Sequence, residues 1–122
     1  MAKFCYYNIS PENQHKNDCV TRAISLASGL PYSTIRKKLR YTARLLECVR
    51  LCWSCYSFLL TNVFLYRQVN CDNITIGEFA DLHPQGTYLI RIDQHLTVIK
   101  NGDLYDTHDC RHRKCHIVWK VA

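Results

Sequence analysis

Residues 87–107 decide the fold of this chain, and they read TYLIRIDQHLTVIKNGDLYDT. Runs rich in β-branched and aromatic residues fill this segment and lead to Asn101-Gly102, the strongest short signal for a two-residue hairpin turn. The residues that follow, up to Thr107, must then form the returning strand. Ile117, Trp119 and Val121 also recur at every second position, so we predict that a last strand there completes a small antiparallel sheet.

The turn fixes which residues face one another across the hairpin. With a two-residue loop, Lys100 faces Asp103. Asp106 is then a diagonal neighbour of His95, with their backbones about 7–8 Å apart, a gap that the two side chains can close. A register slip of one residue would place them on opposite faces of the sheet. The residues predicted to share one face are His95, Thr97, Ile99, Leu104, Asp106 and His108.

Far upstream, Asn17-Asp18-Cys19 opens an amphipathic helix. Asp18 or Asn17 can cap the free amides of its first turn, and Gly29 followed by Pro31 ends it. A thiol attacks carbonyl groups well only as thiolate, which a helix N-terminus and a neighbouring imidazole favour and an adjacent carboxylate opposes. Cys19 is therefore a candidate nucleophile. The apolar stripe of this helix consists of Val20, Ala23, Ile24 and Ala27.

Cys19, His95 and Asp106 follow one another in the chain order of a Cys-His-Asp catalytic triad. In such a site the imidazole takes the proton of the thiol, and the carboxylate orients the ring. Other interpretations stay open for each residue: Cys19 as a buried small residue, His95 as a structural strand histidine, and Asp106 as the cap of a strand end. His108, which shares the predicted face, is an alternative base.

The remaining segments complete an α+β pattern. Residues 1–17 read as an irregular lead-in, and a second helix begins near Ser33. Thr75 to Glu78 has the form of a capping box and opens a short helix that ends near Pro84. The uncharged segment 51–66 is shorter than the roughly 20 residues that a membrane span needs, so we predict a buried helix plus a strand there. The residues predicted to be buried on the second helix are Ile35, Leu39, Ala43 and Leu46.

The composition fits a small folded protein. A chain of 122 residues can build one hydrophobic core, and we treat residues 1–122 as a single domain. Lys and Arg number 16 against 10 Asp and Glu, and the resulting net charge of +6 attracts anionic partners. The first residues lack the apolar stretch and the cleavage site of a secretory signal, so we expect a cytoplasmic protein with reduced thiols.

Two groups of cysteine and histidine residues indicate a different chemistry. Zinc takes such ligands in tetrahedral sets, but neither group has the spacing of a zinc finger or knuckle, so we expect no metal and no other cofactor. The first group would form one stripe on a single helix and consists of Cys48, Cys52 and Cys55. The second consists of His108, Cys110, His112, Cys115 and His116.

A basic run at residues 111–114, with aromatic residues nearby, is a third candidate feature. Such a loop can follow the phosphates of a nucleic acid. We favour the simpler interpretation that it is a solvated hairpin tip.

Three stretches of this chain resemble the papain-like cysteine peptidase superfamily. They are NDCVTRAI at 17–24, GTYLIRIDQHLTVI at 86–99 and NGDLYD at 101–106. The resemblance extends over 13–32 and 75–110, and it is directed in particular to small bacteriocin-processing-type peptidase domains and to papain-like proteins of bacteriophages.

The resemblance implies a role for each candidate residue. Cys19 would be the nucleophile, His95 the general base and acid, and Asp106 the partner that orients His95. The family places an oxyanion-binding Gln six residues before the nucleophile. In this chain Asn13 occupies that place, with Gln14 one step later and Asn17 closer to the thiol; these three are the candidates for the oxyanion hole.

We therefore expect a papain-like α+β domain, with N-terminal helices packed on a small antiparallel sheet. The implied activity is thiol-dependent acyl transfer by a small cysteine peptidase of bacteriophage type, which would act on a protein or peptide in the host cytoplasm without a membrane partner. The alternative is a catalytically inactive papain-like fold that binds a host protein or, with less support, a nucleic acid.

Overall fold

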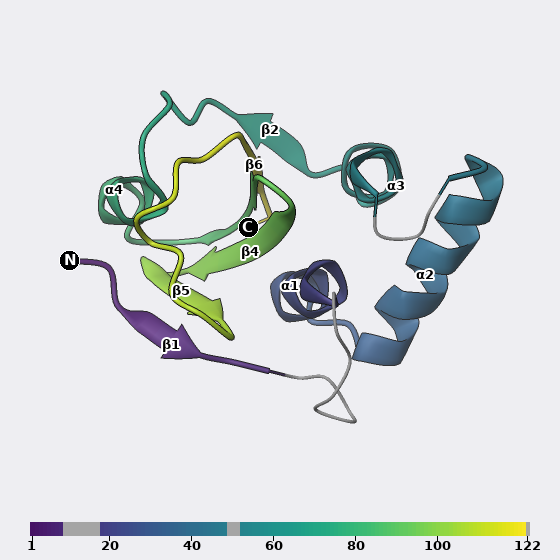
Figure 1. The fold of residues 1–122 in the computed structure, drawn as a ribbon, viewed down its shortest axis with the longest axis horizontal. Helices are drawn as coiled ribbons and strands as arrows, with labels where there is room; N and C mark the ends of the chain where they lie inside the picture. The colour runs from purple at the N-terminus through teal and green to yellow at the C-terminus, as the bar shows by residue number, and fades with distance from the viewer. Residues whose placement is uncertain (9–17, 49–51, 122) are drawn as a thin grey trace.

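The computed structural model of the chain describes residues 1–8, 18–48 and 52–121. Helices and strands mix along the chain in an α+β arrangement (Figure 1). The helices are α1 (Cys19–Ser28), α2 (Tyr32–Leu45), α3 (Trp53–Phe58), which continues into the π-helical turn η1 (Leu59–Val63), and α4 (Ile76–Leu82). The strands are β1 (Phe4–Tyr6), β2 (Arg67–Val69), β3 (Thr87–Ile92), β4 (His95–Lys100), β5 (Asp103–Asp106) and β6 (Ile117–Lys120).

The strands form a six-stranded sheet in the order β1-β5-β4-β3-β6-β2. Neighbouring strands are antiparallel except for β1, which runs parallel to β5. The antiparallel strands predicted within 87–107 and 117–121 are confirmed. The prediction of a wholly antiparallel sheet was wrong, because it did not include β1.

The hairpin between β4 and β5 has the register that the sequence predicts. Lys100 lies opposite Asp103, and Val98 lies opposite Tyr105. The loop residues Asn101 and Gly102 have φ angles of 52° and 81°. Positive φ at both central positions is what a type I′ turn requires, and Asn-Gly supplies it with little strain.

Strand β1 lies where the sequence predicts an irregular lead-in, so that prediction was wrong for Phe4–Tyr6. Its three residues pair with Leu104, Tyr105 and Asp106 of β5. The free edge of β5 offers unpaired backbone groups, and Ala2 anchors the segment by donating its N–H to Asp81 at 2.7 Å. A segment of three residues is too short for its sequence pattern to predict this long-range pairing.

Hydrophobic clusters form on both faces of the sheet. On one face α1, α2 and α3 pack against Leu89, Leu96, Val98 and Trp119. On the opposite face α4 packs against Ile90, Ile92, Ile99, Leu104 and Val118. Figure 1 shows the same division, with α4 across the sheet from α1 and α2. Successive side chains of a strand therefore point in turn into the two hydrophobic clusters, as the twofold period of a strand requires.

The N-terminal helices follow the predicted pattern. Gly29 ends α1 in the left-handed conformation, with φ of 77°, and Ile35, Leu39 and Ala43 of α2 are buried. Leu46 is only half-buried, because α2 has ended and the residue serves as its C-cap. The capping box of α4 is present, since the Thr75 hydroxyl accepts from the amide of Glu78 at 3.1 Å.

The middle of the chain contains the predicted buried helix, although the strand lies later than predicted. Helix α3 and η1 fill 53–63, and β2 follows at the edge of the sheet, beyond the apolar segment. The indole N–H of Trp119 donates to Thr61 at 3.1 Å and joins η1 to the sheet. In the described part of the chain, no helix combines the length and the apolar character needed to cross a membrane.

Candidate active site

Cys19 is the first residue of α1. The amides in the first turn of a helix have no acceptor within the helix, so the N-terminus carries a partial positive charge that favours a thiolate. The Cys19 side chain is partly buried and packs against the core below α1. The prediction that this residue opens a helix is confirmed.

Asp18 precedes α1 at the N-cap position but does not cap it with its side chain. Its carboxylate instead accepts from the Arg22 guanidinium, one helical turn later, and from the Tyr32 hydroxyl at 2.9 Å. The predicted capping by Asp18 was therefore wrong, and Asn17, the other predicted cap, lies outside the described residues. The charge of Asp18 is thus matched by that of Arg22.

His95 and Asp106 meet as the hairpin register predicts. Nε2 of His95 lies 2.6 Å from Oδ2 of Asp106. The other carboxylate oxygen of Asp106 accepts from the backbone N–H of Thr107 at 2.6 Å and lies 3.8 Å from Nη2 of Arg22. Burial raises the pKa of the Asp106 carboxyl group, but the hydrogen bond and the charge of His95 lower it overall.

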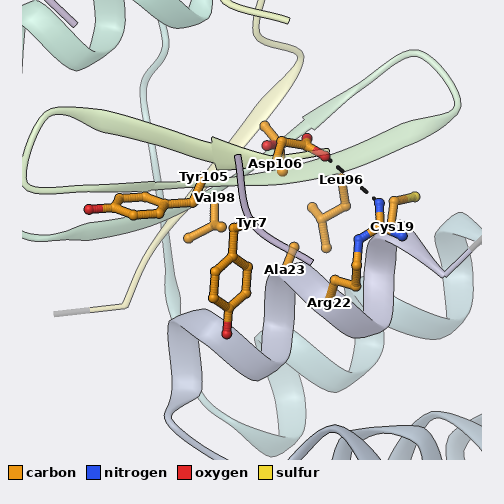
Figure 2. Close-up of a pocket in the computed structure, with 9 residues that line it drawn as sticks. Tyr7, Cys19, Arg22, Ala23, Leu96, Val98, Tyr105 and Asp106 are labelled. Carbon is orange, nitrogen blue, oxygen red and sulfur yellow. Dashed lines mark ion pairs between the residues drawn. The ribbon is translucent and has the colours of Figure 1, made fainter. Parts of the chain in front are cut away.

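The side chains from α1 and those from the hairpin meet at the end of the sheet. Leu96 and Val98 point toward α1, while Asp106 lies on the other side of the strands, as Figure 2 shows. Arg22 extends from α1 past the strand end, and its ion pair with Asp106 is drawn there. The predicted set of residues on one face is correct for Ile99 and Leu104, which face α4, and the site forms at the edge where that face meets α1.

The imidazole of His95 connects the thiol to the carboxylate. Burial disfavours the charged ring, yet its hydrogen bonds with Asp106 and two neighbouring thiols, Cys110 and Cys19, raise the pKa of His95 to about 11. Since Nε2 is bonded to Asp106, Nδ1 is the nitrogen left for Cys19. The ring is therefore a cation held between two groups that favour its charge.

The same contacts act on the thiol in the opposite direction. Burial raises the pKa of Cys19, but the hydrogen bond to His95, a backbone hydrogen bond at Leu96 and the charge of His95 bring it below its ordinary value. A raised imidazole pKa and a lowered thiol pKa both favour transfer of the thiol proton to the ring. The resulting thiolate–imidazolium pair is the form in which a cysteine acts as a nucleophile.

A groove of about 420 Å³ opens beside the thiol. Helix α3 forms one wall, and the turn between β3 and β4 forms the other. Its lining residues are Cys19, Val20, Trp53, Tyr56, Arg91, Asp93, Gln94 and His95. An extended peptide segment of one or two residues fits a groove of this volume.

The predicted oxyanion hole cannot be placed. Asn13, Gln14 and Asn17 lie outside the described residues. In the described part of the chain, the backbone amide of Cys19 at the start of α1 is suited to donate to an oxyanion, because helix geometry gives it no intrahelical acceptor.

His108, the alternative base, is exposed and lies beside His95, with 5.0 Å between their ring centroids. Its Nδ1 contacts the Thr107 hydroxyl at 3.2 Å, and it is not among the groups that shift the pKa of Cys19. The geometry thus assigns the contact with the thiol to His95.

Among the described residues, a possible metal-binding group consists of His95, Asp106 and His108, whose ligand atoms lie within 4.8 Å of one another. Two imidazoles and a carboxylate suit a transition metal. An ion would have to displace the hydrogen bond between His95 and Asp106 and the proton of a ring whose pKa is about 11, so protonation competes with metal binding.

Three of the other cysteines, Cys48, Cys52 and Cys55, interact with one another. Cys48 follows α2, Cys52 precedes α3 and Cys55 lies within it, so these three do not share one helix as the stripe would require. Cys110 and Cys115 are buried in the core under α4. All eight cysteines are free thiols.

Several site residues escaped the sequence analysis. Arg22 was detectable in principle, since Asp18 and Arg22 have the i, i+4 spacing of a helical ion pair. Trp53, Tyr56 and Arg91 come from elements far apart in the chain, and no spacing relates them to Cys19.

Comparisons of the chain with protein-family models, curated proteins and solved structures gave no match.

Proposed function

We propose that this protein is a thiol-dependent acyl-transfer enzyme of papain-like type, acting as a small cysteine peptidase. The observation that carries the proposal is the placement of one imidazole between a thiol at a helix N-terminus and a buried carboxylate. His95 contacts Asp106 at 2.6 Å and is hydrogen-bonded to Cys19. Asp106 is only 5% exposed, so its charge is screened little and holds the ring firmly.

In the proposed reaction the Cys19 thiolate attacks the carbonyl carbon of an amide in the groove. The carbonyl π electrons move onto oxygen, and the amide N–H of Cys19 donates to the resulting oxyanion. The imidazolium of His95 then gives its proton to the amide nitrogen as the C–N bond breaks. The amine leaves, and a thioester joins the acyl group to Cys19.

Deacylation reverses the roles of the groups. Neutral His95 removes a proton from water, the hydroxide adds to the thioester carbon, and the C–S bond breaks to regenerate the thiolate. The products are a carboxylic acid and the ion pair of the resting enzyme. An amine in place of water would make the reaction a transamidation with the same steps.

The experiment that tests the proposal is acylation by an activated ester. A p-nitrophenyl ester should release about one equivalent of nitrophenolate in a rapid burst, because acylation outpaces hydrolysis of the thioester. We expect the burst to disappear in Cys19→Ala and to persist in Cys48→Ala, a half-buried thiol outside the groove. A burst that survives in Cys19→Ala, or that is missing from the wild type, would refute the proposal.

The rival function is binding without catalysis, and a separate observation favours it. A groove of about 330 Å³ between α2 and the continuous helix of α3 and η1 is lined mainly by apolar and aromatic side chains, with Lys37 and Lys38 among them. Tyr41, Leu45 and Val63 there are 69%, 60% and 49% exposed, which is unusual for large apolar side chains grouped together. If binding is the function, Cys19→Ala should retain the full biological effect of the wild type in cells, whereas an enzyme should lose it.

The bacteriophage type and the host cytoplasm as the place of action follow from the resemblance in sequence alone. Within the proposal they narrow the substrate to a protein or peptide of the host cell. The acylation experiment stands independently of them.

A further inference from the structure

Arg91 places a positive charge in the groove beside the proposed nucleophile. It stands near the end of β3, opposite Leu96 and Ile117 on the neighbouring strands, and it lines the groove together with Cys19 and His95. Its side chain leaves the sheet on the side of α1 and α3, and its Cζ lies 4.4 Å from the centre of the Trp53 ring.

Aromatic groups of α3 hold this guanidinium in place. Stacking on Trp53 fixes its plane through a cation–π contact. The hydroxyl of Tyr56, a residue that is 5% exposed, accepts a hydrogen bond from Arg91. Burial raises the pKa of Tyr56, and the charge and hydrogen bond of Arg91 oppose that rise, so the phenol stays neutral and does not cancel the positive charge.

No carboxylate neutralises Arg91 within the described parts of the chain. The ion pairs found there engage other cations, such as Arg22, His95 and Arg111. Asp93 lines the same groove, but it is exposed and lies beyond ion-pair distance of Arg91.

A guanidinium has five N–H donors, and neither the ring under it nor one phenol can use them all. The free edge of Arg91 is thus available to the contents of the groove. A planar guanidinium recognises a carboxylate through two parallel hydrogen bonds, which gives both attraction and orientation. A half-buried cation with no carboxylate partner among the described residues is the feature that points to an anionic ligand.

We propose that Arg91 forms an anion subsite, so that the enzyme selects substrates with a carboxylate close to the carbonyl that Cys19 attacks. This inference rests on the proposed function and adds the substrate class to it. The carboxylate is either an acidic side chain next to the scissile bond or the free C-terminus of the substrate.

The first test compares two alkylating reagents of nearly equal size, iodoacetate and iodoacetamide, on the intact protein. The ratio of their rates at Cys19, measured by peptide mapping, reports the local preference for an anion. The imidazolium of His95 contributes to this ratio in every variant and cancels in the comparison. We expect Arg91→Met to lower the ratio by about fivefold or more, the effect of one unscreened charge within a few ångströms.

Matched variants separate the role of the charge from that of packing. Arg91→Lys keeps the charge and should retain most of the ratio, even if the loss of stacking loosens α3. Asp93→Asn removes a negative charge from the groove and should raise the ratio. Arg40→Met, at an exposed position of α2 that does not line the groove, changes the net charge equally and should match the wild type. A ratio that is the same in wild type, Arg91→Met and Asp93→Asn would overturn the inference.

The two proposals fail in different ways. If iodoacetamide labels Cys19 of the wild type no faster than Cys48, the proposed function fails whatever the ratio is. If Cys19 is alkylated faster than Cys48 but the ratio of the iodoacetate and iodoacetamide rates is the same in wild type and Arg91→Met, only the anion subsite fails.

The second test identifies the source of the carboxylate with pairs of fluorogenic peptides. One pair exchanges Glu for Gln beside the scissile bond, and the other exchanges a free C-terminus for an amide. The member with the carboxylate should have the higher kcat/KM in one pair, and that advantage should be lost in Arg91→Met. If neither pair shows an advantage that depends on Arg91, the inference is wrong.

Discussion

Replacement of His95 by Ala tests the central contact of the site. The thiol of Cys19 owes its lowered pKa to the hydrogen bond and the charge of His95, which act against burial. A cation within a few ångströms lowers the pKa of an acid by about 1–3 units. Loss of His95 should therefore raise the pKa of Cys19, and each unit of such a rise lowers the fraction of thiolate about tenfold at pH values below both pKa values.

The rate of alkylation should fall by less than the fraction of thiolate. Each thiolate of the variant is a stronger nucleophile, because reactivity rises with basicity with a Brønsted coefficient of about 0.4–0.5. Per unit of rise in pKa, each thiolate therefore becomes about threefold more reactive, and the net rate of alkylation in acid falls about three- to fourfold. In alkali, where both proteins are fully ionised, the variant should be the faster one. We expect the two pH–rate profiles to cross.

The assay is alkylation of Cys19 by iodoacetamide across the pH range, quantified by peptide mapping because all eight cysteines are free. His108→Ala is the matched control, since its exposed ring lies 5.0 Å from that of His95 and contacts Thr107 instead of the thiol. We expect it to follow the wild-type profile. The reasoning would be refuted if the pH–rate profiles of wild type and His95→Ala coincide. It would also be refuted if His108→Ala loses as much of the alkylation rate as His95→Ala does.

Three further predictions concern stability. Asp106→Asn should lower the free energy of unfolding by about 2 kcal/mol near neutral pH. Folding lowers the pKa of Asp106, so the difference in free energy between wild type and variant should be present above the ordinary pKa of an Asp and should shrink as the pH falls below that value. Urea titrations that show a constant difference across this pH range would contradict the prediction. Gly29→Ala should lower the free energy of unfolding by about 1 kcal/mol, because its φ is positive. Gly102→Ala, also at positive φ, should lower it more, because a Cβ there would lie 3.3 Å from Cα of Pro84, whereas Gly29 has open space. Thr75→Ala should cost about 1 kcal/mol by removing a capping box, and an unchanged thermal midpoint would argue against that contribution.

Local signals explain what the sequence predicted of the fold. The Asn-Gly turn defines the register of β4 and β5 through a conformation that few other dipeptides adopt, and the register places His95 near Asp106. Thr75 and Glu78 mark the start of α4 within four residues. Each of these features depends on residues that are close together in the chain, so a short sequence pattern is enough to predict it.

One error concerns a contact between segments far apart in the chain, and another concerns the choice among nearby partners. The pairing of β1 with β5 joins segments about 100 residues apart, and a segment as short as Phe4–Tyr6 carries no periodicity to reveal it. Asp18 was expected to cap α1, which is the commonest role of an N-cap aspartate, but Arg22 and Tyr32 offer its carboxylate charged and buried partners instead.

The sequence by itself determined a cysteine at a helix start and a carboxylate diagonally across a hairpin from an imidazole, because helix starts and tight turns depend on adjacent residues. Only the tertiary structure decided that α1 brings Cys19 to the sheet edge where His95 and Asp106 meet, and that α3 stacks Trp53 on Arg91 above the groove. Those contacts depend on how hydrophobic faces of separate elements pack together, and packing is a property of the whole chain that no short pattern contains.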